Sequence, residues 1–222
     1  MDSKSKKTFN SFYSKEDFYY GLEVRPEFSE YFNDKALSEK VGLDLGCGEG
    51  RYAIFLARKG CRVVCVDRSK AGLDKLEEVG RTESLQISPR LKGIADFTFM
   101  ENSYDIIVAA TILDHLDNDL RPRIVEGIKS SLKPGGTLYA NVFTVQDPGY
   151  RVKKAAPCSM ESGDISDTSA FMTHYFEHDE LKAMFNGFEI FYYYEGVEQD
   201  LSHGSPHAHG WASMLAKKPL DT

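Results

Sequence analysis

Residues 41–51 read VGLDLGCGEGR, a short apolar run followed by glycine at every second position. This pattern is typical of a buried β-strand that leads through a tight turn into a helix. Glycine has no Cβ atom and adopts positive φ at little cost, so the backbone of such a turn can lie in contact with a ligand. We therefore predict a ligand-binding turn at residues 46–50.

The spacing of these glycines distinguishes between two kinds of ligand. A dinucleotide-binding turn has the pattern Gly-x-Gly-x-x-Gly, which would require glycine at position 51, where Arg51 stands. Instead an acid, Asp44, precedes the first of the three glycines by two residues. A carboxylate at that position suits a cationic group of a ligand and would repel a pyrophosphate. The turn therefore argues against a nicotinamide dehydrogenase.

A second strand follows at the distance that such a fold requires. Residues 52–59 have the apolar spacing of a helix, and residues 61–66 form a second apolar run that ends at Asp67. An acid at the end of the second strand, about twenty residues beyond the glycine turn, is placed to accept hydrogen bonds from ribose hydroxyls. In this frame we interpret Asp67 as a ribose ligand rather than as a solvated loop residue.

The rest of the chain continues the alternation of strands and helices. The patterns predict helices at 69–79 and 119–132, and strands at 90–95, 104–110 and 137–145. This alternation predicts an α/β fold, a doubly wound parallel sheet with helices on both faces, whose ligands bind beyond the carboxyl ends of the strands. The residues expected at that edge are Asp44, Gly46, Asp67, Asp96 and Thr111.

Length and composition indicate one soluble domain over residues 1–222. With 41% apolar residues the chain can bury one core, and its net charge of -7 makes duplex nucleic acid or an anionic membrane surface an unsuitable partner. No apolar run reaches the ~18 residues of a membrane span, and the polar, basic start lacks the apolar segment of a signal peptide. The four cysteines contain no Cys-x-x-Cys pair, so we expect free thiols and a cytoplasmic location.

The run from Val41 to Thr144 resembles a class I S-adenosylmethionine (SAM) dependent methyltransferase. The segments GEGRYAIFLA at 48–57, DRSKAGL at 67–73 and YDII at 104–107 are similar to one branch, the tellurite-resistance-type (TehB-like) small-molecule methyltransferases. Residues 171–176, 180–181, 194–195 and 214–218 extend this resemblance. It implies SAM as the cofactor and a Rossmann-like, mostly parallel sheet of seven strands with the last strand antiparallel.

The resemblance also assigns residues to parts of the cofactor. Asp44 and Gly46 would contact the methionine end of SAM, and Asp67 would bind the ribose. Asp96 and the backbone N–H of Phe97 would recognise the adenine edge, although Asp96 also fits an ordinary loop acid. The full set expected to bind the cofactor is Tyr20, Asp44, Gly46, Cys47, Gly48, Gly50, Asp67, Arg68, Asp96, Phe97 and Thr111.

Two segments flank this core. Residues 1–35 are rich in aromatic side chains, which fits both a helix pair packed on the core and a lid that closes over the cofactor and excludes water. Residues 146–173 form a connection that is long for a compact domain, and we predict that this insertion determines the substrate. Its lone Cys158 is more typical of an inert thiol than of a metalloid ligand.

Three histidines form the pattern His-x-x-x-His-x-His at residues 203–209. Imidazoles at this spacing could bind zinc, but the glycines of the segment give little rigidity and no cysteine is near, so we expect no metal. The resemblance places the segment between the last two strands and facing the substrate, where His203 or His207 could act as a catalytic base. The arginines that accompany the histidine in tellurite-type enzymes are not evident, which argues against an oxyanion substrate.

We therefore expect transfer of a methyl group from SAM to a small-molecule acceptor such as a thiol, chalcogen or metalloid. A soft nucleophile of this kind needs little more than deprotonation and in-line alignment. Two alternatives stay open: an O-methyltransferase for a phenol or quinone-like molecule, and a non-catalytic SAM-binding module. The sequence leaves the oligomeric state open.

Overall fold

The computed structural model describes residues 9–15, 17–155, 174–200 and 206–220. A short helical stretch at residues 9–13 precedes the main body. The helices and strands that follow are α2 (Pro26–Phe32), β1 (Val41–Leu45), α3 (Arg51–Arg58), β2 (Arg62–Asp67), α4 (Lys70–Thr82), β3 (Ile87–Leu91), η1 (Ile94–Asp96), β4 (Tyr104–Ala110), η2 (Leu113–His115), α5 (Leu120–Ser131), β5 (Leu132–Phe143), α6 (Pro148–Ala155), α7 (Glu180–Met184), β6 (Glu189–Asp200) and β7 (His207–Lys217).

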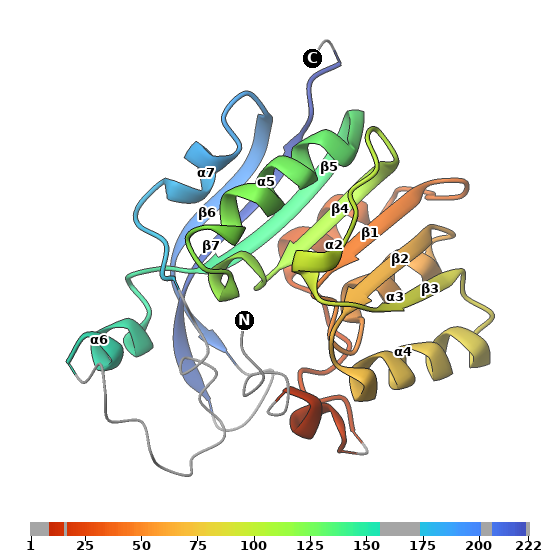
Figure 1. Cartoon of the computed structure of the whole chain (residues 1–222), viewed down its shortest axis with the longest axis horizontal. Coiled ribbons are helices and arrows are strands. Elements are labelled where there is room, and N and C mark those ends of the chain that lie inside the picture. The colour runs from red at the N-terminus through yellow and green to blue at the C-terminus, as the bar shows by residue number, and fades with distance from the viewer. Residues whose placement is uncertain (1–8, 16, 156–173, 201–205, 221–222) are drawn as a thin grey trace.

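All seven strands join one sheet in the order β3-β2-β1-β4-β5-β7-β6 (Figure 1). The pairs between β3 and β5 are parallel, whereas β7 is antiparallel to both of its neighbours. This confirms the predicted α/β sheet with the last strand antiparallel. The chain runs outward from β1 to β3, then returns to place β4 on the other side of β1. Such a reversal opens a crevice at the carboxyl ends of β1 and β4, where ligands of this fold class bind.

Helices cover both faces of the sheet and bury two apolar cores. On one face α5 and α7 pack Ile124, Ile128 and Phe185 against the strands, and Figure 1 shows these two helices in front of the sheet. On the other face α2, α3 and α4 supply a second set that includes Phe28, Leu56 and Leu76. Burial on both faces explains why the central strands read as continuous apolar runs.

Two predicted strands differ in their limits from the observed ones. The third strand is β3, which ends at Leu91, and the segment expected to continue it to residue 95 forms the 3-10 turn η1 instead. Pro89 interrupts the apolar pattern of this strand, but β3 is an edge strand, where proline is tolerated. The fifth strand begins at Leu132 rather than at residue 137, because a register shift beside Tyr104 admits the additional residues.

Other expectations fall partly outside the described residues. Within the described ranges, Cys47, Cys61 and Cys65 are free thiols, and no helix has the length and apolar character needed to cross a membrane. Helix α6 occupies the start of the expected insertion. Residues 156–173, which include Cys158, lie outside the described part, so the predictions for them stay predictions.

Candidate active site

The glycine turn after β1 has no room for side chains. Gly46 and Gly48 adopt positive φ values of 66° and 55°. A Cβ atom on Gly46 would lie 2.7 Å from Ile112, and one on Gly48 would lie 2.7 Å from the hydroxyl of Tyr13. Both distances are well inside van der Waals contact. The turn is therefore shaped so that backbone, rather than side chains, faces a ligand.

Asp44 lies near the carboxyl end of β1 with only 2% of its surface exposed. The backbone N–H of Ala53 donates to its Oδ2 at 3.2 Å. The pKa of Asp44 is raised to about 7, mainly by burial and to a smaller extent by the neighbouring Asp67, against the opposing effects of the Ala53 hydrogen bond and Arg51. A buried carboxylate with so little compensation is a site for a cationic group, whose arrival would stabilise the ionised form.

Asp67 ends β2 and connects the glycine turn to α4. Its Oδ2 accepts a hydrogen bond from the N–H of Gly48 at 2.9 Å, and its Oδ1 accepts one from the N–H of Ser69 at 2.7 Å. Burial raises the pKa of Asp67 although these two hydrogen bonds oppose the change. Ser69 is the N-cap of α4, because its Oγ accepts a hydrogen bond from the N–H of Gly72.

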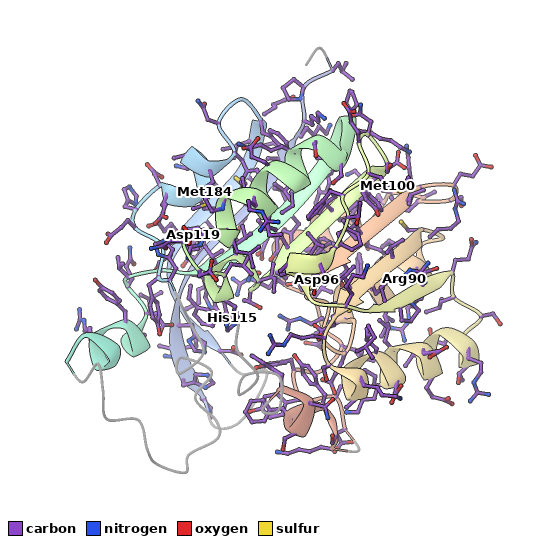
Figure 2. All side chains as sticks on the ribbon, viewed as in Figure 1. Arg90, Asp96, Met100, His115, Asp119 and Met184 are labelled. Carbon is purple, nitrogen blue, oxygen red and sulfur yellow. The ribbon has the colours of Figure 1, made fainter. Side chains whose placement is uncertain are left out.

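One cavity of about 640 Å³ spans this edge of the sheet. Figure 2 shows Asp96 and His115 at the same edge. Of the eleven expected cofactor residues, ten line the cavity: Tyr20, Asp44, Gly46, Cys47, Gly48, Gly50, Asp67, Arg68, Asp96 and Thr111. Phe97 is not part of the lining. Its N–H donates to the carbonyl of Ile94 at 3.2 Å within η1, and its ring packs on Phe99, so the structure differs from the expectation for Phe97.

The aromatic N-terminal segment packs on the glycine turn. Tyr13 and Tyr20 line the cavity, and burial raises the pKa of both hydroxyls. Glu49 fastens the segment: its Oε2 accepts from the N–H of Tyr19 at 2.7 Å, and its Oε1 pairs with Lys75 at 2.6 Å. This Glu49–Lys75 latch has side-chain exposures of only 5% and 18%. The segment is thus part of the cavity wall.

Asn141 and Thr111 form the floor between the two ends of the cavity. Thr111 adopts a positive φ of 47°, and its N–H donates to both the carbonyl of Asn141 at 2.9 Å and the side-chain Oδ1 at 3.2 Å. The Nδ2 of Asn141 is buried and has no hydrogen-bond partner among the described residues. A buried donor in a cavity wall indicates a ligand acceptor, because an unpaired amide would otherwise destabilise the fold.

The other end of the cavity is built from β5, β6 and β7. The rings of Phe143 and Trp211 stack with centroids 4.1 Å apart, and the guanidinium of Arg25 lies 5.3 Å from the Trp211 ring. Arg25 is already paired with Glu27 at 2.9 Å and with Glu198. An anionic ligand would therefore compete with two carboxylates for Arg25.

Two of the three histidines of the sequence pattern lie at this end. His203 lies outside the described residues. His207 and His209 are in β7, and it is His209 that lines the cavity. Its Nδ1 lies 2.8 Å from Oδ2 of the buried Asp147, and its Nε2 lies 2.9 Å from Nε2 of His207.

Comparisons with known proteins agree with this geometry. Residues 43–136 match the model of a family described as a methyltransferase domain. The probable SAM-dependent methyltransferase TehB of Haemophilus influenzae is 28% identical over 187 residues, which cover 83% of this chain and 59% of that protein. Hemagglutinin 1 of Eikenella corrodens is 28% identical over an alignment of 224 positions, gaps included. The alignment covers 92% of this chain and 68% of the relative.

Together the comparisons support a class I SAM-dependent methyltransferase. The crystal structure of H. influenzae TehB aligns with a TM-score of 0.68 at 24% identity and covers 88% of this chain and 62% of that one. That likeness shows the fold. The present chain spans about three fifths of the length of the TehB relatives. TehB-like proteins are the branch that it resembles, and SAM is its cofactor.

The cavity of this methyltransferase fits SAM on its own residues. The buried carboxylate of Asp44 can bind the α-amino group of SAM, and the glycines of the turn, which have no side chains, leave room for the methionine end. The Nδ2 of Asn141, which has no partner among the described residues, can donate a hydrogen bond to the ligand. Asp147, Arg25 and Trp211 were not predicted from the sequence as site residues, and His209 entered only as part of the histidine pattern. One signal for His209 was present: residues two apart in a strand share a face, so His207 and His209 had to point the same way.

Proposed function

We propose that this methyltransferase acts on a small molecule and transfers the methyl group to a soft acceptor atom, such as that of a thiol, chalcogen or metalloid. One observation carries the proposal: the cofactor residues and the aromatic and imidazole residues line the same cavity of about 640 Å³. A volume of this size is typical of small-molecule sites.

SAM, when bound, supplies an electrophilic methyl group on a sulfonium. The residues of the chain bind and orient the reactants. Asp44 would hold the α-amino group, Asp67 would accept from the ribose while it keeps the glycine turn closed, and Tyr13 and Tyr20 exclude water from one side. Holding acceptor and methyl carbon in line at about 3 to 3.5 Å provides much of the rate enhancement of such a displacement.

The opposite end of the cavity favours a soft acceptor over an oxyanion. Its walls include the stacked Phe143 and Trp211 rings and His209, and the nearby Arg25 is paired with two carboxylates. Polarisable acceptor atoms lie well against aromatic rings. The expectation that His203 or His207 acts on the acceptor stays a proposal, and we add His209, the histidine of β7 that lines the cavity.

The stacked rings favour one second candidate, a planar phenol or quinol that lies against Phe143 and Trp211. A panel assay separates the two. Formation of S-adenosylhomocysteine would be followed with small thiols, the reduced chalcogen selenide, the oxyanions selenite and tellurite, and catechols as acceptors. We expect the highest kcat/KM with a thiol or a reduced chalcogen. Turnover confined to catechols would replace the proposal with the second candidate. Tight SAM binding without turnover across the panel would leave a non-catalytic SAM-binding module.

Two substitutions test the imidazole end directly. His203→Ala and His207→Ala should leave SAM affinity unchanged, because we expect both residues to act on the acceptor, and His207 is absent from the cavity lining. Methyl transfer should fall, by roughly 10² to 10⁴ if the residue acts as general acid or base. Unchanged turnover in both variants would remove these residues from the reaction.

A further inference from the structure

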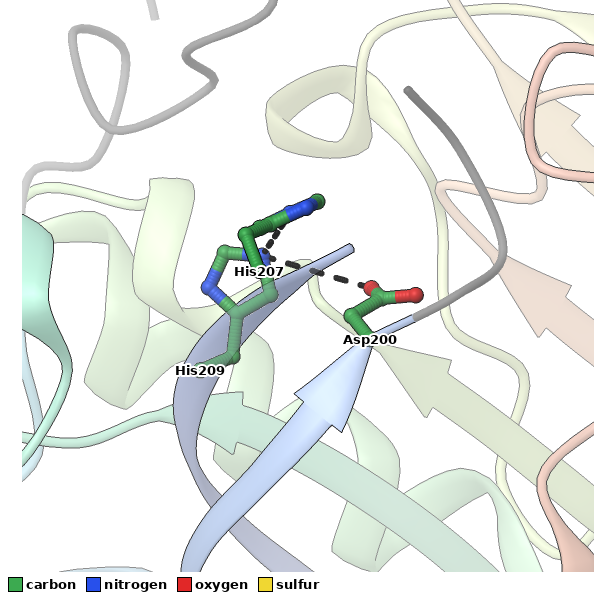
Figure 3. Close-up of side chains that lie close together, drawn as sticks. All are labelled: Asp200, His207 and His209. Carbon is green, nitrogen blue, oxygen red and sulfur yellow. Dashed lines mark hydrogen bonds and ion pairs between the residues drawn. The ribbon is translucent and has the colours of Figure 1, made fainter. Parts of the chain in front are cut away.

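Three potential metal ligands converge where β6 and β7 meet. Asp200 ends β6 and pairs with His207 across the antiparallel ladder, and His209 follows two residues later on the same face of β7. Figure 3 shows the two imidazoles and the carboxylate pointing toward one another. The Nε2 atoms of the histidines are 2.9 Å apart, Oδ2 of Asp200 is 4.0 Å from Nε2 of His209, and one ligand atom from each residue lies within 4.8 Å of the others.

Asp147 fixes the orientation of His209 from behind. Its carboxylate is nearly buried, with 4% of the side chain exposed, and accepts from Nδ1 of His209 at 2.8 Å and from the N–H of Gly210 at 3.0 Å. A Cβ atom on Gly210 would lie 2.3 Å from the backbone of Asp147, so only glycine allows this approach. Because Nδ1 is held by the carboxylate, Nε2 is the ring atom directed toward His207 and Asp200. Carboxylate–histidine pairs of this kind orient metal-binding imidazoles.

The distances suit a metal ion of zinc size. Bonds of 2.0–2.1 Å in tetrahedral geometry place neighbouring ligand atoms about 3.3 Å apart, between the 2.9 and 4.0 Å observed here. Two imidazoles and one carboxylate leave a fourth position open, as in catalytic rather than structural zinc sites. The expectation of no metal assumed that the histidines lie in a flexible glycine segment. The structure instead places His207 and His209 on β7, which is paired with β6. The two side chains would therefore lose little conformational entropy when a metal ion binds.

We propose that Asp200, His207 and His209 bind one divalent first-row transition ion, with Zn²⁺ as the probe, at the acceptor end of the cavity. Resting on the proposed function, this assigns the ion a role: its open position takes the acceptor sulfur. A thiol that binds there loses its proton to solvent, since a coordinated thiol is deprotonated. The acceptor sulfur then forms a bond to the methyl carbon while the bond between that carbon and the sulfonium of SAM breaks. The electron pair of the broken bond stays on the sulfur of S-adenosylhomocysteine.

A second group of candidate ligands provides a control within the same chain. His178, Asp179 and Glu195 also lie close together, but His178 has 77% of its side chain exposed and lies outside the cavity lining. His178→Ala removes an imidazole without touching the proposed site. It is the matched control for His207→Ala and His209→Ala.

The test uses the full chain, free of any histidine tag and dialysed against a chelator. Zn²⁺ is titrated by calorimetry, and Co²⁺ by visible absorption, which reports tetrahedral coordination without any need for turnover. We expect one equivalent of each ion. The affinity should fall at least 100-fold in His207→Ala and His209→Ala, and about 10- to 100-fold in Asp147→Asn, which disturbs only the orienting carboxylate. His178→Ala should match the wild type.

Binding weaker than the millimolar range, or binding that His178→Ala reduces and His209→Ala does not, would overturn the metal site. S-adenosylhomocysteine is titrated into the same samples, and a normal affinity there shows that each variant is folded. Intact cofactor binding without zinc binding would remove only the metal site. If the wild type neither binds S-adenosylhomocysteine nor turns over any acceptor, the proposed function itself would be wrong.

Discussion

Replacing Asp44 by asparagine should make the ligand-free protein more stable and at the same time weaken its hold on the cofactor. The substitution keeps the size of the side chain, and its amide oxygen can still accept from the N–H of Ala53. What it removes is a charge that is 98% inaccessible to water in the absence of ligand, as the 2% exposure of Asp44 shows. The two effects have different causes and can be measured separately.

The magnitude follows from the pKa. Burial raises the pKa of Asp44 from 3.8 to about 7, and one pKa unit corresponds to about 1.4 kcal/mol. The folded protein therefore holds a proton that the unfolded chain releases between these two values. Stability is highest below pH 4, declines as the pH rises towards 7, and is then lower by about 4 kcal/mol. Asparagine carries no such proton, so the variant should gain most of this amount at pH 8 and little at pH 4.5.

Cofactor binding should change in the opposite direction. A hydrogen bond between the Asp44 carboxylate and the cationic α-amino group contributes about 1.5–3 kcal/mol, so the Asp44→Asn variant should bind S-adenosylhomocysteine roughly 10- to 150-fold more weakly. In the wild type the affinity should rise with pH through about 7, as the carboxyl group ionises. Urea unfolding and calorimetric titration, each at pH 5 and pH 8, measure the two effects.

Asp105→Asn is the matched control at the opposite end of the sheet. Desolvation tends to raise the pKa of Asp105, but hydrogen bonds from Lys133, the N–H of Val41 and Lys40 outweigh it and lower the pKa. Its charge is therefore stabilising at neutral pH and ceases to be so as the pH falls through the lowered pKa. Asp105→Asn should lose stability at pH 8 and bind the cofactor normally. If Asp44→Asn is as destabilised at pH 8 as this control, or binds the cofactor like the wild type, the reasoning is refuted.

Three further outcomes are expected. SAM and S-adenosylhomocysteine should raise the melting temperature, by the equivalent of about 2.7 kcal/mol at 100 times Kd, and NAD should leave it unchanged; a shift with NAD alone would contradict the site. Asp67→Ala should weaken SAM binding by roughly 1–3 kcal/mol and also lower the melting temperature without ligand, because the N–H of Gly48 loses its acceptor. Glu49→Gln should speed amide hydrogen exchange at Tyr19 and weaken SAM binding, since it breaks the latch to Lys75; unchanged exchange would show that the latch does not hold the segment.

The cofactor end of the site could be predicted because its determinants are local in the sequence. Asp44 and the three glycines stand within seven residues, and Asp67 follows one helix later. Each of these residues occupies a position that strand and turn geometry alone define. The edge strand β3 was placed less well, because Pro89 interrupts its pattern and only its position at the sheet edge explains the tolerance.

The acceptor end could not be assembled in this way. Asp147 and His209 are 62 residues apart in sequence and meet only because β7 inserts between β5 and β6. The pairing of Asp200 with His207 depends on the register between β6 and β7, which the apolar pattern of the two strands does not define. Spacing indicated that His207 and His209 share a face, but nothing local indicated which buried carboxylate lies behind them.

The two ends of the cavity are supported by different parts of the fold, so acceptor specificity can change while cofactor binding is kept. The cofactor end rests on β1, β2 and the turn after β4, which pack into both apolar cores. The acceptor end rests on the tips of β6 and β7 and on Asp147, beyond the parallel part of the sheet. Substitutions there can alter the acceptor chemistry without disturbing the turn that holds SAM, since function is determined by sites carried on a fold rather than by the fold itself. If the histidine cluster binds a metal ion, its loss should therefore change which acceptors are methylated while cofactor affinity stays the same.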